Sequence, residues 1–143
     1  MTTPLTGGCM CGAIRYTISV PVTELRACHC TTCQKGSGTQ GSVNAVIPAS
    51  AFKLTQGTPK RYDCLADSGR TLHRCFCGDC GSPIYSKRAT ALDTLEVRAG
   101  TLEDPGEMKI TANIWTRSAR PWACIDPASK QFPGQPDAPA AQK

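Results

Sequence analysis

Hydrophobic and polar residues alternate along much of this chain, and the alternation predicts strands. Ile14, Tyr16, Ile18 and Val20 are apolar at every second position, which places them on one face of an extended segment. Other short runs have a similar strand-like character: Ser42–Ile47, Lys60–Cys64, Pro83–Ser86, Leu95–Ala99 and Ile110–Ile114. We therefore expect an all-β domain built from many short strands.

Turn-forming residues separate these runs about every ten positions. This spacing is typical of antiparallel sandwiches and barrels. The clusters are Gly36–Gly38, Gln56–Pro59, Asp67–Gly69 and Asp104–Gly106. A helix of one or two turns is expected only near Thr31–Lys35, so the fold class is all-β with antiparallel sheets and little helix.

The chain length suits one domain, followed by a short tail. A chain of 143 residues has room for a single hydrophobic core. We assign this domain to residues 1–130. Residues 131–143 contain three prolines and few large hydrophobic residues, and they end in Ala-Pro-Ala-Ala-Gln-Lys. Such a composition predicts a tail that is mobile or draped over the domain.

The charge of the chain does not indicate a nucleic-acid partner. There are 16 Lys and Arg against 11 Asp and Glu, for a formal net charge of +5. Seven thiolates binding two Zn²⁺ ions would contribute three net negative charges and lower the total to about +2. The basic residues are scattered, with no run of like charges and no interleaved aromatic residues.

The ten cysteines are best interpreted as metal ligands. The first residues lack the basic and apolar regions of a signal peptide, and no stretch approaches the ~18 apolar residues that span a bilayer. We therefore expect a cytoplasmic protein without a membrane segment. Thiols stay reduced in the cytoplasm, which disfavours the alternative of a secreted, disulfide-bonded scaffold.

Two cysteine pairs have spacings that suit one tetrahedral metal site. Cys9 and Cys11 are two residues apart, so in an extended segment both sulfurs point the same way. Cys77 and Cys80 form a CxxC knuckle. Together they provide four thiolates, the ligand set of a structural zinc. The metal would join the start of the domain to its middle.

Cys28, Cys30 and Cys33 offer three further sulfurs within six residues. Three protein ligands with a fourth position open to substrate are typical of a catalytic zinc. The alternative is a second structural zinc completed by a distant residue, and the spacing alone favours neither. The residues that could complete such a site are Cys64, Cys75, Cys124 and His73.

The remaining candidates have structural interpretations. Alternation points His29 away from the sulfurs beside it, so we expect it to be packed or solvent-facing. The three cysteines outside the two clusters are expected to be small buried hydrophobic residues. Trp115 and Trp122 are expected in the core or at its rim.

Several motifs resemble the glutathione-dependent formaldehyde-activating enzyme family, which also includes a chromatin-associated centromere protein. The motifs lie in Gly8–Tyr16, Cys28–Gly38, Arg74–Pro83 and Ile114–Trp122. The resemblance extends from Gly7 to Pro136, with the motifs in the expected order.

This resemblance implies a β-tent fold of antiparallel sheets with two zinc ions. It assigns one structural zinc to Cys9, Cys11, Cys77 and Cys80. It assigns one catalytic zinc to Cys28, Cys30 and Cys33, and so favours the open site. Cys75 departs from the family pattern, because it lies inside the third motif where no ligand is expected.

The implied activity is that of a zinc-dependent carbon–sulfur lyase. It would add or remove a small aldehyde such as formaldehyde at the thiol of glutathione or a related thiol. Lys35, Arg74 and Arg117 are candidates for offsetting the negative charge of the site and holding the carboxylates of the thiol. The alternatives are a non-catalytic binding module with two structural zincs, and an enzyme acting on another thiol adduct.

Overall fold

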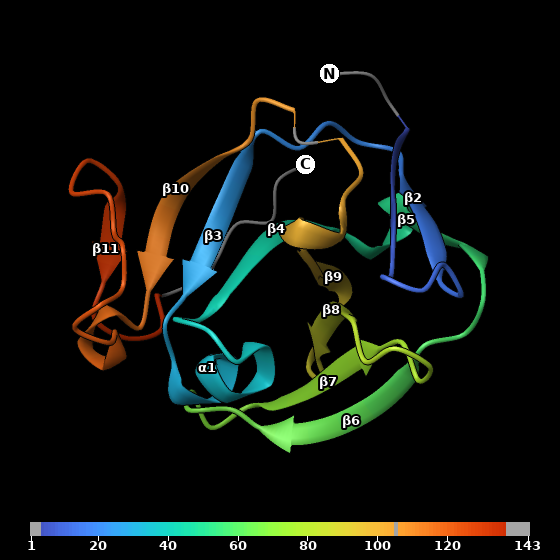
Figure 1. The fold of residues 1–143 in the computed structure, drawn as a ribbon. Coiled ribbons are helices and arrows are strands. Elements are labelled where there is room, and N and C mark those ends of the chain that lie inside the picture. The colour runs from blue at the N-terminus through green and yellow to red at the C-terminus, as the bar shows by residue number, and fades with distance from the viewer. Residues whose placement is uncertain (1–3, 105, 137–143) are drawn as a thin grey trace.

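In the computed structural model, which describes residues 4–104 and 106–136, the chain folds into two β-sheets and one short α-helix (Figure 1). The first half of the chain contains β1 (Leu5–Gly8), β2 (Arg15–Ile18), β3 (Glu24–Cys28), α1 (Thr31–Ser37), β4 (Ser42–Pro48), β5 (Phe52–Gln56) and β6 (Lys60–Leu65). The second half contains β7 (Thr71–Phe76), β8 (Pro83–Arg88), β9 (Ala91–Arg98), β10 (Lys109–Ile114) and β11 (Lys130–Phe132). Single 3-10 turns lie at Ala49–Ala51, Ala99–Thr101 and Thr116–Ser118.

The smaller sheet has the strand order β1-β2-β5, and both of its pairings are antiparallel. Its inner face carries Tyr16 and Ile18, which are almost completely buried. The ring of Phe52 stacks on Tyr16, with ring centroids 4.9 Å apart. The predicted alternation in this segment is therefore confirmed, because alternate residues of β2 do face the core.

The larger sheet has the order β11-β10-β3-β4-β9-β8-β7-β6. Its pairings are antiparallel from β3 to β6, but β10 runs parallel to both β3 and β11. The antiparallel expectation therefore holds for most of the fold and not for these two pairs. One α-helix and six strands lie between β3 and β10 in the sequence, and this long connection permits the parallel pairing.

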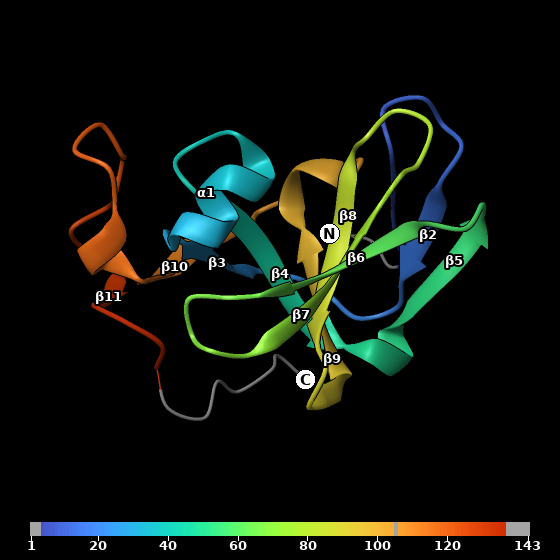
Figure 2. The same ribbon diagram turned by 90° about the horizontal axis from the view of Figure 1, so that it is seen from below.

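The large sheet bends so that its β6–β7 end returns beneath α1 (Figures 1 and 2). Asp67, in the turn between β6 and β7, accepts hydrogen bonds from the amide and the hydroxyl of Thr31 at 2.9 and 2.7 Å. The turn is thereby attached to the beginning of the helix. The bend creates a concave face in which α1 is flanked by β4 and by the β6–β7 hairpin.

The main hydrophobic core lies between the two sheets. It includes Leu5, Tyr16, Ile47, Ile84 and Val97, each with at most 1% of its surface exposed. A second, smaller cluster contains three cysteines together with Ile114 and Trp115, and Phe132 packs against it. These two apolar clusters surround different cysteine groups.

The expected all-β class and the short helix near residue 31 are confirmed. The C-terminal segment up to residue 136 lies against the domain, because β11 pairs with β10 and the indole of Trp115 donates to Gln135 at 3.1 Å. The rest of the predicted tail, 137–143, lies outside the described residues. No helix in the described part of the chain is long and apolar enough to cross a membrane.

Candidate metal centres

The first cysteine cluster joins the two sheets. Cys9 and Cys11 lie in the turn between β1 and β2, whereas Cys77 and Cys80 lie in the turn between β7 and β8. Their four sulfurs all lie within 4.8 Å of one another. This arrangement agrees with the expectation from the sequence that the two distant cysteine pairs lie together.

The local backbone of both turns directs the sulfurs inward. Gly12 and Gly81 have φ of 86° and 82°, a left-handed conformation that favours glycine. The amide of Ile14 donates to the Cys9 sulfur at 3.2 Å, and Ser82 lies 3.2 Å from the Cys80 sulfur. The Ser82 hydroxyl and amide lower the pKa of Cys80 to about 5. These neutral donors favour the thiolate form of Cys9 and Cys80, whereas the neighbouring sulfurs and burial raise the pKa of Cys11 to about 12.

The sulfur spacings fit a tetrahedral ion. Zinc–sulfur bonds of ~2.3 Å arranged tetrahedrally place sulfurs about 3.8 Å apart. The Cys9 and Cys11 sulfurs are 3.6 Å apart, and those of Cys11 and Cys77 are 3.8 Å apart. The four thiolates could therefore hold one zinc with little movement.

The second cluster lies where β3 leads into α1. Cys28 is the last residue of β3, Cys30 precedes the helix and Cys33 lies in its first turn. All three are buried, and their sulfurs lie within 4.8 Å of one another. The Cys30 sulfur also accepts the amide of Cys33 at 3.3 Å and so caps the helix.

Buried polar contacts hold this segment in place. The side-chain amide of Gln34 donates to the carbonyl oxygens of His29 and Ser118 at 2.8 and 2.9 Å. Arg120 donates to the Gln34 side-chain oxygen at 2.7 Å. The sulfur-bearing turn is therefore fixed to the segment that follows β10, which makes its geometry rigid.

The three sulfurs do not share negative charge equally. Hydrogen bonds from Cys28 and Cys30, and more weakly the charge of Arg74, keep the pKa of Cys33 far below its usual value. Hydrogen bonds with Cys30 and Cys33, together with burial, raise the pKa of Cys28 well above its usual value. One sulfur thus ionises easily, but a bound cation is needed to ionise all three.

Among the described residues, none supplies a fourth ligand to this cluster. Cys64, Cys75, Cys124 and His73 all lie outside the group of mutually close sulfurs. His73 instead bonds to Asp63 through Nδ1 at 2.7 Å. The alternative of a second completed site therefore finds no ligand in the described structure.

The expectation that the other three cysteines are buried is wrong for two of them. Cys75 is buried, but Cys64 is half-buried and Cys124 is exposed. Cys64 lies on β6, the edge strand of the large sheet, and Cys124 lies in the loop after the last 3-10 turn. Trp122 is likewise exposed, whereas Trp115 is buried.

His29 is buried and faces away from the sulfurs, as the alternation predicts. Only 1% of its surface is exposed, and its Nε2 lies 2.8 Å from the side-chain oxygen of Asn113. Since that oxygen can only accept, Nε2 carries the proton. The imidazole therefore links β3 to β10 and is not directed at the metal centre.

A small cavity of about 40 Å³ lies against the three-sulfur cluster. All three cysteines line it, together with Leu72 and Trp115. Its polar lining residues include Arg26, Asn44, Asp67, Arg88, Glu96 and Gln135. Trp115 has a left-handed backbone with φ of 59°, which costs a non-glycine residue about 1–3 kcal/mol. Its indole hydrogen bond to Gln135 holds the ring as one wall of the cavity.

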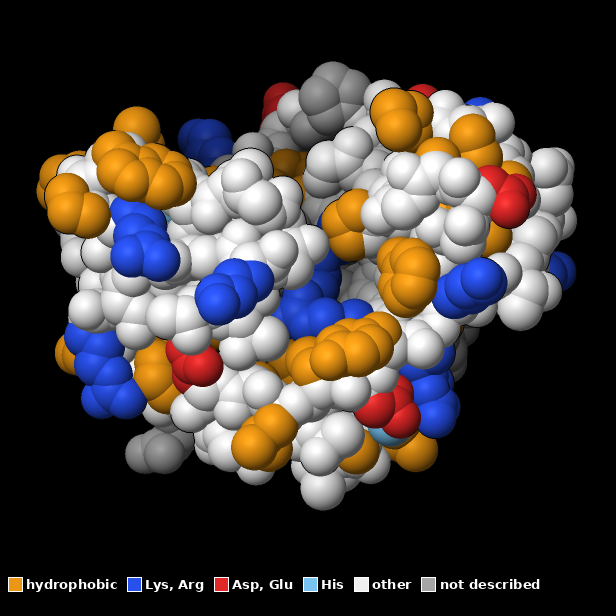
Figure 3. Space-filling view, turned by 60° about the horizontal axis from the view of Figure 1, so that its bottom comes forward, with side chains coloured by type: hydrophobic (Ala, Val, Ile, Leu, Met, Phe, Trp, Pro, Cys, Tyr) orange, Lys and Arg blue, Asp and Glu red, His pale blue; other side chains and the backbone are white. Residues whose placement is uncertain are grey.

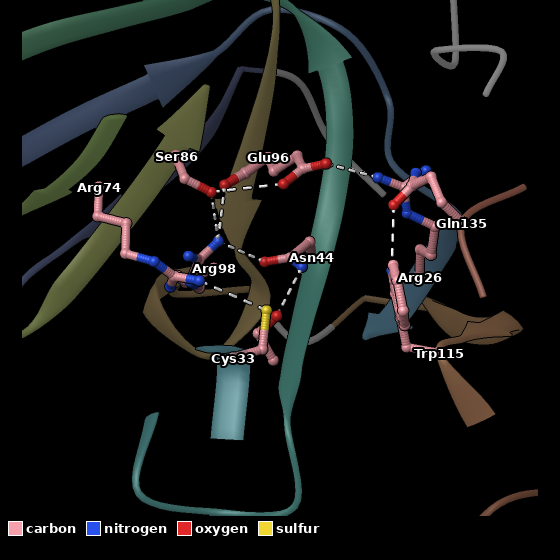
Figure 4. A network of polar contacts seen from close by, with 10 residues as sticks. Arg26, Cys33, Asn44, Arg74, Ser86, Glu96, Arg98, Trp115 and Gln135 are labelled. Atoms are coloured by element: carbon pink, nitrogen blue, oxygen red, sulfur yellow. Dashed lines mark hydrogen bonds and ion pairs between the residues drawn. The ribbon is translucent and has the colours of Figure 1, made fainter. Parts of the chain in front are cut away.

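Two arginines lie next to Cys33 on the other side of the cluster (Figure 4). Arg74 donates to the Cys33 sulfur from Nη2 at 3.6 Å. Arg98 reaches the same sulfur indirectly: it donates to the Asn44 side-chain oxygen at 2.6 Å, and Asn44 donates to Ser42 at 3.0 Å. Ser42 in turn hydrogen-bonds to Cys33 and favours its thiolate.

Sequence reasoning identified Arg74 as a cation near the site but missed Arg98 and Asp67. Arg98 looks like an ordinary last residue of a strand, and Asp67 looks like a turn residue. Of the other expected cations, Lys35 is exposed on α1, and Arg117 lies over the ring of Trp115 at 4.8 Å from its centroid. These positions are far apart in the sequence, so their proximity can be recognised only from the three-dimensional fold.

The structure thus defines a mostly β protein with two cysteine clusters that could hold metal ions, one tying two sheets together and one facing a cavity. The family model for the glutathione-dependent formaldehyde-activating enzyme matches residues 4–118. The chain therefore belongs to this family, as the sequence motifs indicated.

Individual relatives are distant. Proteins from Sordaria macrospora, Penicillium rubens and Emericella nidulans, each named "Putative glutathione-dependent formaldehyde-activating enzyme", are 30%, 29% and 29% identical to the chain over 90, 79 and 79 residues. These matches cover 59%, 55% and 55% of the chain but only 37%, 40% and 39% of the relatives.

A crystal structure of a Rhodobacter sphaeroides protein has a similar fold. Its TM-score is 0.56 at 21% identity, and the match covers 72% of this chain and 96% of that one. At this identity the likeness supports the fold and not the chemistry.

Proposed function

We propose that the protein is a zinc-dependent carbon–sulfur lyase, which adds formaldehyde to, or removes it from, the thiol of glutathione or a related small thiol. Cys9, Cys11, Cys77 and Cys80 would hold a structural zinc, and Cys28, Cys30 and Cys33 a catalytic one. The observation that carries the proposal is the three-sulfur cluster, which faces a cavity and finds no fourth ligand among the described residues.

The size of the cavity supports a very small aldehyde. About 10–15 Å³ of such volume holds one water molecule, so about 40 Å³ accommodates roughly two or three non-hydrogen atoms. Formaldehyde fits this limit, whereas a branched or aromatic aldehyde does not. A tripeptide such as glutathione is far too large for the cavity and must approach the cluster from outside it.

The proposed reaction conserves all atoms. The thiol sulfur attacks the aldehyde carbon and forms a carbon–sulfur bond, while the carbon–oxygen double bond becomes a single bond. The proton lost by the thiol ends on the aldehyde oxygen, which gives an S-hydroxymethyl thioether. Zinc bound to three thiolates would supply the positive charge that favours ionisation of a thiol brought to its remaining position.

The chain itself would position and balance the site. Three thiolates around Zn²⁺ leave one net negative charge, and Arg74 lies beside Cys33 to offset it. Trp115 and Leu72 would hold the aldehyde in a confined space next to the sulfurs. Confinement raises the effective concentration of the two reactants, which contributes to the rate because the spontaneous addition is bimolecular.

Exchange spectroscopy tests this proposal. Proton NMR of glutathione, formaldehyde and their adduct at equilibrium gives the rate of interconversion with and without the reduced, two-zinc protein. We expect the protein to accelerate exchange and Cys30→Ser to remove the acceleration. No acceleration by the two-zinc protein would instead favour a binding module. A titration with nucleic acid over a range of salt concentrations would then examine that alternative, since phosphate contacts produce a steep salt dependence.

A further inference from the structure

A hollow lies between α1 and the β6–β8 strands, outside the small cavity. It consists of two adjoining spaces of about 300 and 450 Å³, both lined by Gly36, Tyr62 and Arg74. Arg98 lines the first space and Lys35 the second. Figure 3 shows a hollow near the middle of this face with Lys and Arg side chains on its floor and hydrophobic side chains around it. The volume is in the range of small-ligand sites.

The guanidinium of Arg74 forms the boundary between the hollow and the three-sulfur cluster. Its Nε donates to the Cys64 sulfur at 3.3 Å and its Nη2 to the Cys33 sulfur at 3.6 Å. Its Nη1 lies over Gly36, where an added Cβ would come within 2.9 Å of it. The absence of a side chain at Gly36 therefore lets Arg74 take this position against the helix.

Arg98 is the second cation of the floor, and only 9% of its surface is exposed. Its Nη1 donates to Asn44, to Ser86 and to the carbonyl oxygen of Glu96. The Glu96 carboxylate itself is paired with Arg26 at 2.5 Å. Among the described residues, neither Arg98 nor Arg74 forms a salt bridge with a carboxylate.

The two guanidinium groups differ in their negative neighbours: Arg74 lies against the sulfurs of Cys33 and Cys64, whereas Arg98, among the described residues, donates only to neutral oxygens. Burial lowers the pKa of Arg98; the charges of Cys33 and Glu96 oppose this shift, and the charge of Arg74 adds to it. A buried guanidinium that is paired with no carboxylate is costly, so Arg98 on the floor of the hollow, with Arg74 beside it, favours an anion from outside.

We propose that Arg74 and Arg98 form an anion subsite on the floor of this hollow, which binds a carboxylate of the thiol cosubstrate. The inference rests on the proposed function and adds a specificity to it: anionic thiols are selected over neutral ones. Because Arg74 contacts both the hollow and Cys33, a carboxylate held on it keeps the rest of the ligand beside the metal centre. Lys35 adds positive charge at the rim.

Binding of an unreactive analogue tests the subsite without any turnover. S-methylglutathione carries the carboxylates of glutathione but has no free thiol, and its dimethyl ester lacks the negative charges. Calorimetry with the reduced, two-zinc protein gives both dissociation constants. We expect the diester to bind about tenfold more weakly than the acid, and the acid to lose affinity as salt is added.

Substitution of Arg74 completes a double-mutant cycle in which the other change is the esterification of the ligand. Arg74→Gln should weaken binding of the acid about tenfold and leave binding of the diester unchanged, since the two changes remove the same ion pair. Equal weakening of both ligands, equal affinity of the acid and the diester for the unaltered protein, or no binding of the acid at all would overturn the subsite. Arg61→Gln is the control, because Arg61 is exposed on β6 and paired with Asp63.

Gly36→Ala separates the subsite from general stability. Alanine favours a helix over glycine, so the unfolding temperature should stay the same or rise. The new methyl group would displace the Arg74 guanidinium, and we expect affinity for the acid to fall several-fold. Unchanged affinity would contradict the assigned position of Arg74. Arg98 is left intact, because its three Nη1 hydrogen bonds join β4, β8 and β9.

The two proposals can fail separately. Selective binding of the acid without accelerated formaldehyde exchange would leave the subsite standing and reject the lyase. Accelerated exchange with equal affinity for acid and diester would leave the lyase standing and reject the subsite.

Discussion

The two cysteine clusters use the same ligand atoms in different surroundings. The four-sulfur cluster joins the β1–β2 and β7–β8 turns, and two of its cysteines belong to the main core. The three-sulfur cluster lies within one continuous segment, faces a cavity and has Arg74 beside it. Both clusters receive neutral hydrogen bonds, but among the described residues only the second has an arginine hydrogen-bonded to one of its sulfurs. The clusters thus differ in surroundings and connectivity rather than in ligand type, and the proposed structural and catalytic roles rest on this difference.

The largest expected effect follows from removing a ligand of the four-sulfur cluster. Cys77→Ser should abolish binding of one zinc and prevent cooperative folding, since structural zinc contributes on the order of 10 kcal/mol and a domain has about 5–15 kcal/mol of stability. Circular dichroism melting and metal analysis would measure this. Cys124→Ser, at an exposed position, is the control. A Cys77→Ser protein that folds normally would remove the distinction between the clusters.

The next effect concerns activity more than stability. Cys30→Ser should reduce formaldehyde exchange at least about a hundredfold, while the protein retains one zinc and its cooperative unfolding. The reason is that Cys28, Cys30 and Cys33 come from one segment, so their metal ties no distant strands together. Exchange NMR and thermal melting give the two readouts. Loss of folding comparable to that of Cys77→Ser would break the comparison.

A smaller change tests the core around the four-sulfur cluster. Tyr16 is buried and its hydroxyl lies 2.7 Å from that of Thr101. Tyr16→Phe should lower stability at pH 7 by about 1 kcal/mol through loss of this hydrogen bond, and leave formaldehyde exchange unchanged. Urea denaturation measures the stability.

The difference in stability between the parent protein and Tyr16→Phe should change with pH in a defined direction. Burial raises the pKa of Tyr16 from 10.0 to about 12. As the pH rises, the Tyr16 hydroxyl therefore ionises first in the unfolded chain. Its contribution to the stability of the folded protein is complete below pH 10 and is lost as the pH rises toward 12. The stabilities of the parent protein and Tyr16→Phe should converge above pH 10 and cross near pH 11. A constant difference across this range would contradict the assigned burial effect.

The smallest effect is expected at the turn that covers the three-sulfur cluster. Asp67→Ala removes the acceptor for the Thr31 amide and hydroxyl and should cost about 0.5–1 kcal/mol, as for other helix-start contacts. Hydrogen exchange should accelerate at the Thr31 amide and in the β6–β7 turn. Asp104→Ala, which removes the acceptor for the Gly106 amide in another turn, is the control. Unchanged exchange at Thr31 would show that Asp67 does not hold this turn in place.

The sequence was sufficient where local patterns determine local structure. The strand-like runs predicted β2, β4 and β10, but alternate burial is found only in β2. β4 is buried on both faces, and Ile110 of β10, which alternation placed on the inner face, is exposed. Alternation missed β7, whose Leu72 and Cys75 point to opposite faces and are both buried. The parallel pairing of β10 could not be inferred, because strand direction within a sheet depends on the path of the whole chain.

The candidate site was likewise predictable from the sequence only in part. The cysteine spacings brought both clusters to attention, because ligands of one metal have recognisable separations. The cations and the cavity walls come from elsewhere: Arg74 from β7, Arg98 from β9 and Trp115 from the segment after β10. Their proximity depends on the bend of the large sheet, which no local pattern encodes.

The most direct test of the difference between the clusters is zinc X-ray absorption on the reduced protein containing two zincs. Averaged over both ions, we expect about 3.5 sulfurs per zinc, rising to about 4 when glutathione is added. An average of 4 sulfurs before any thiol is added would mean that the protein completes both sites itself, and would contradict the account.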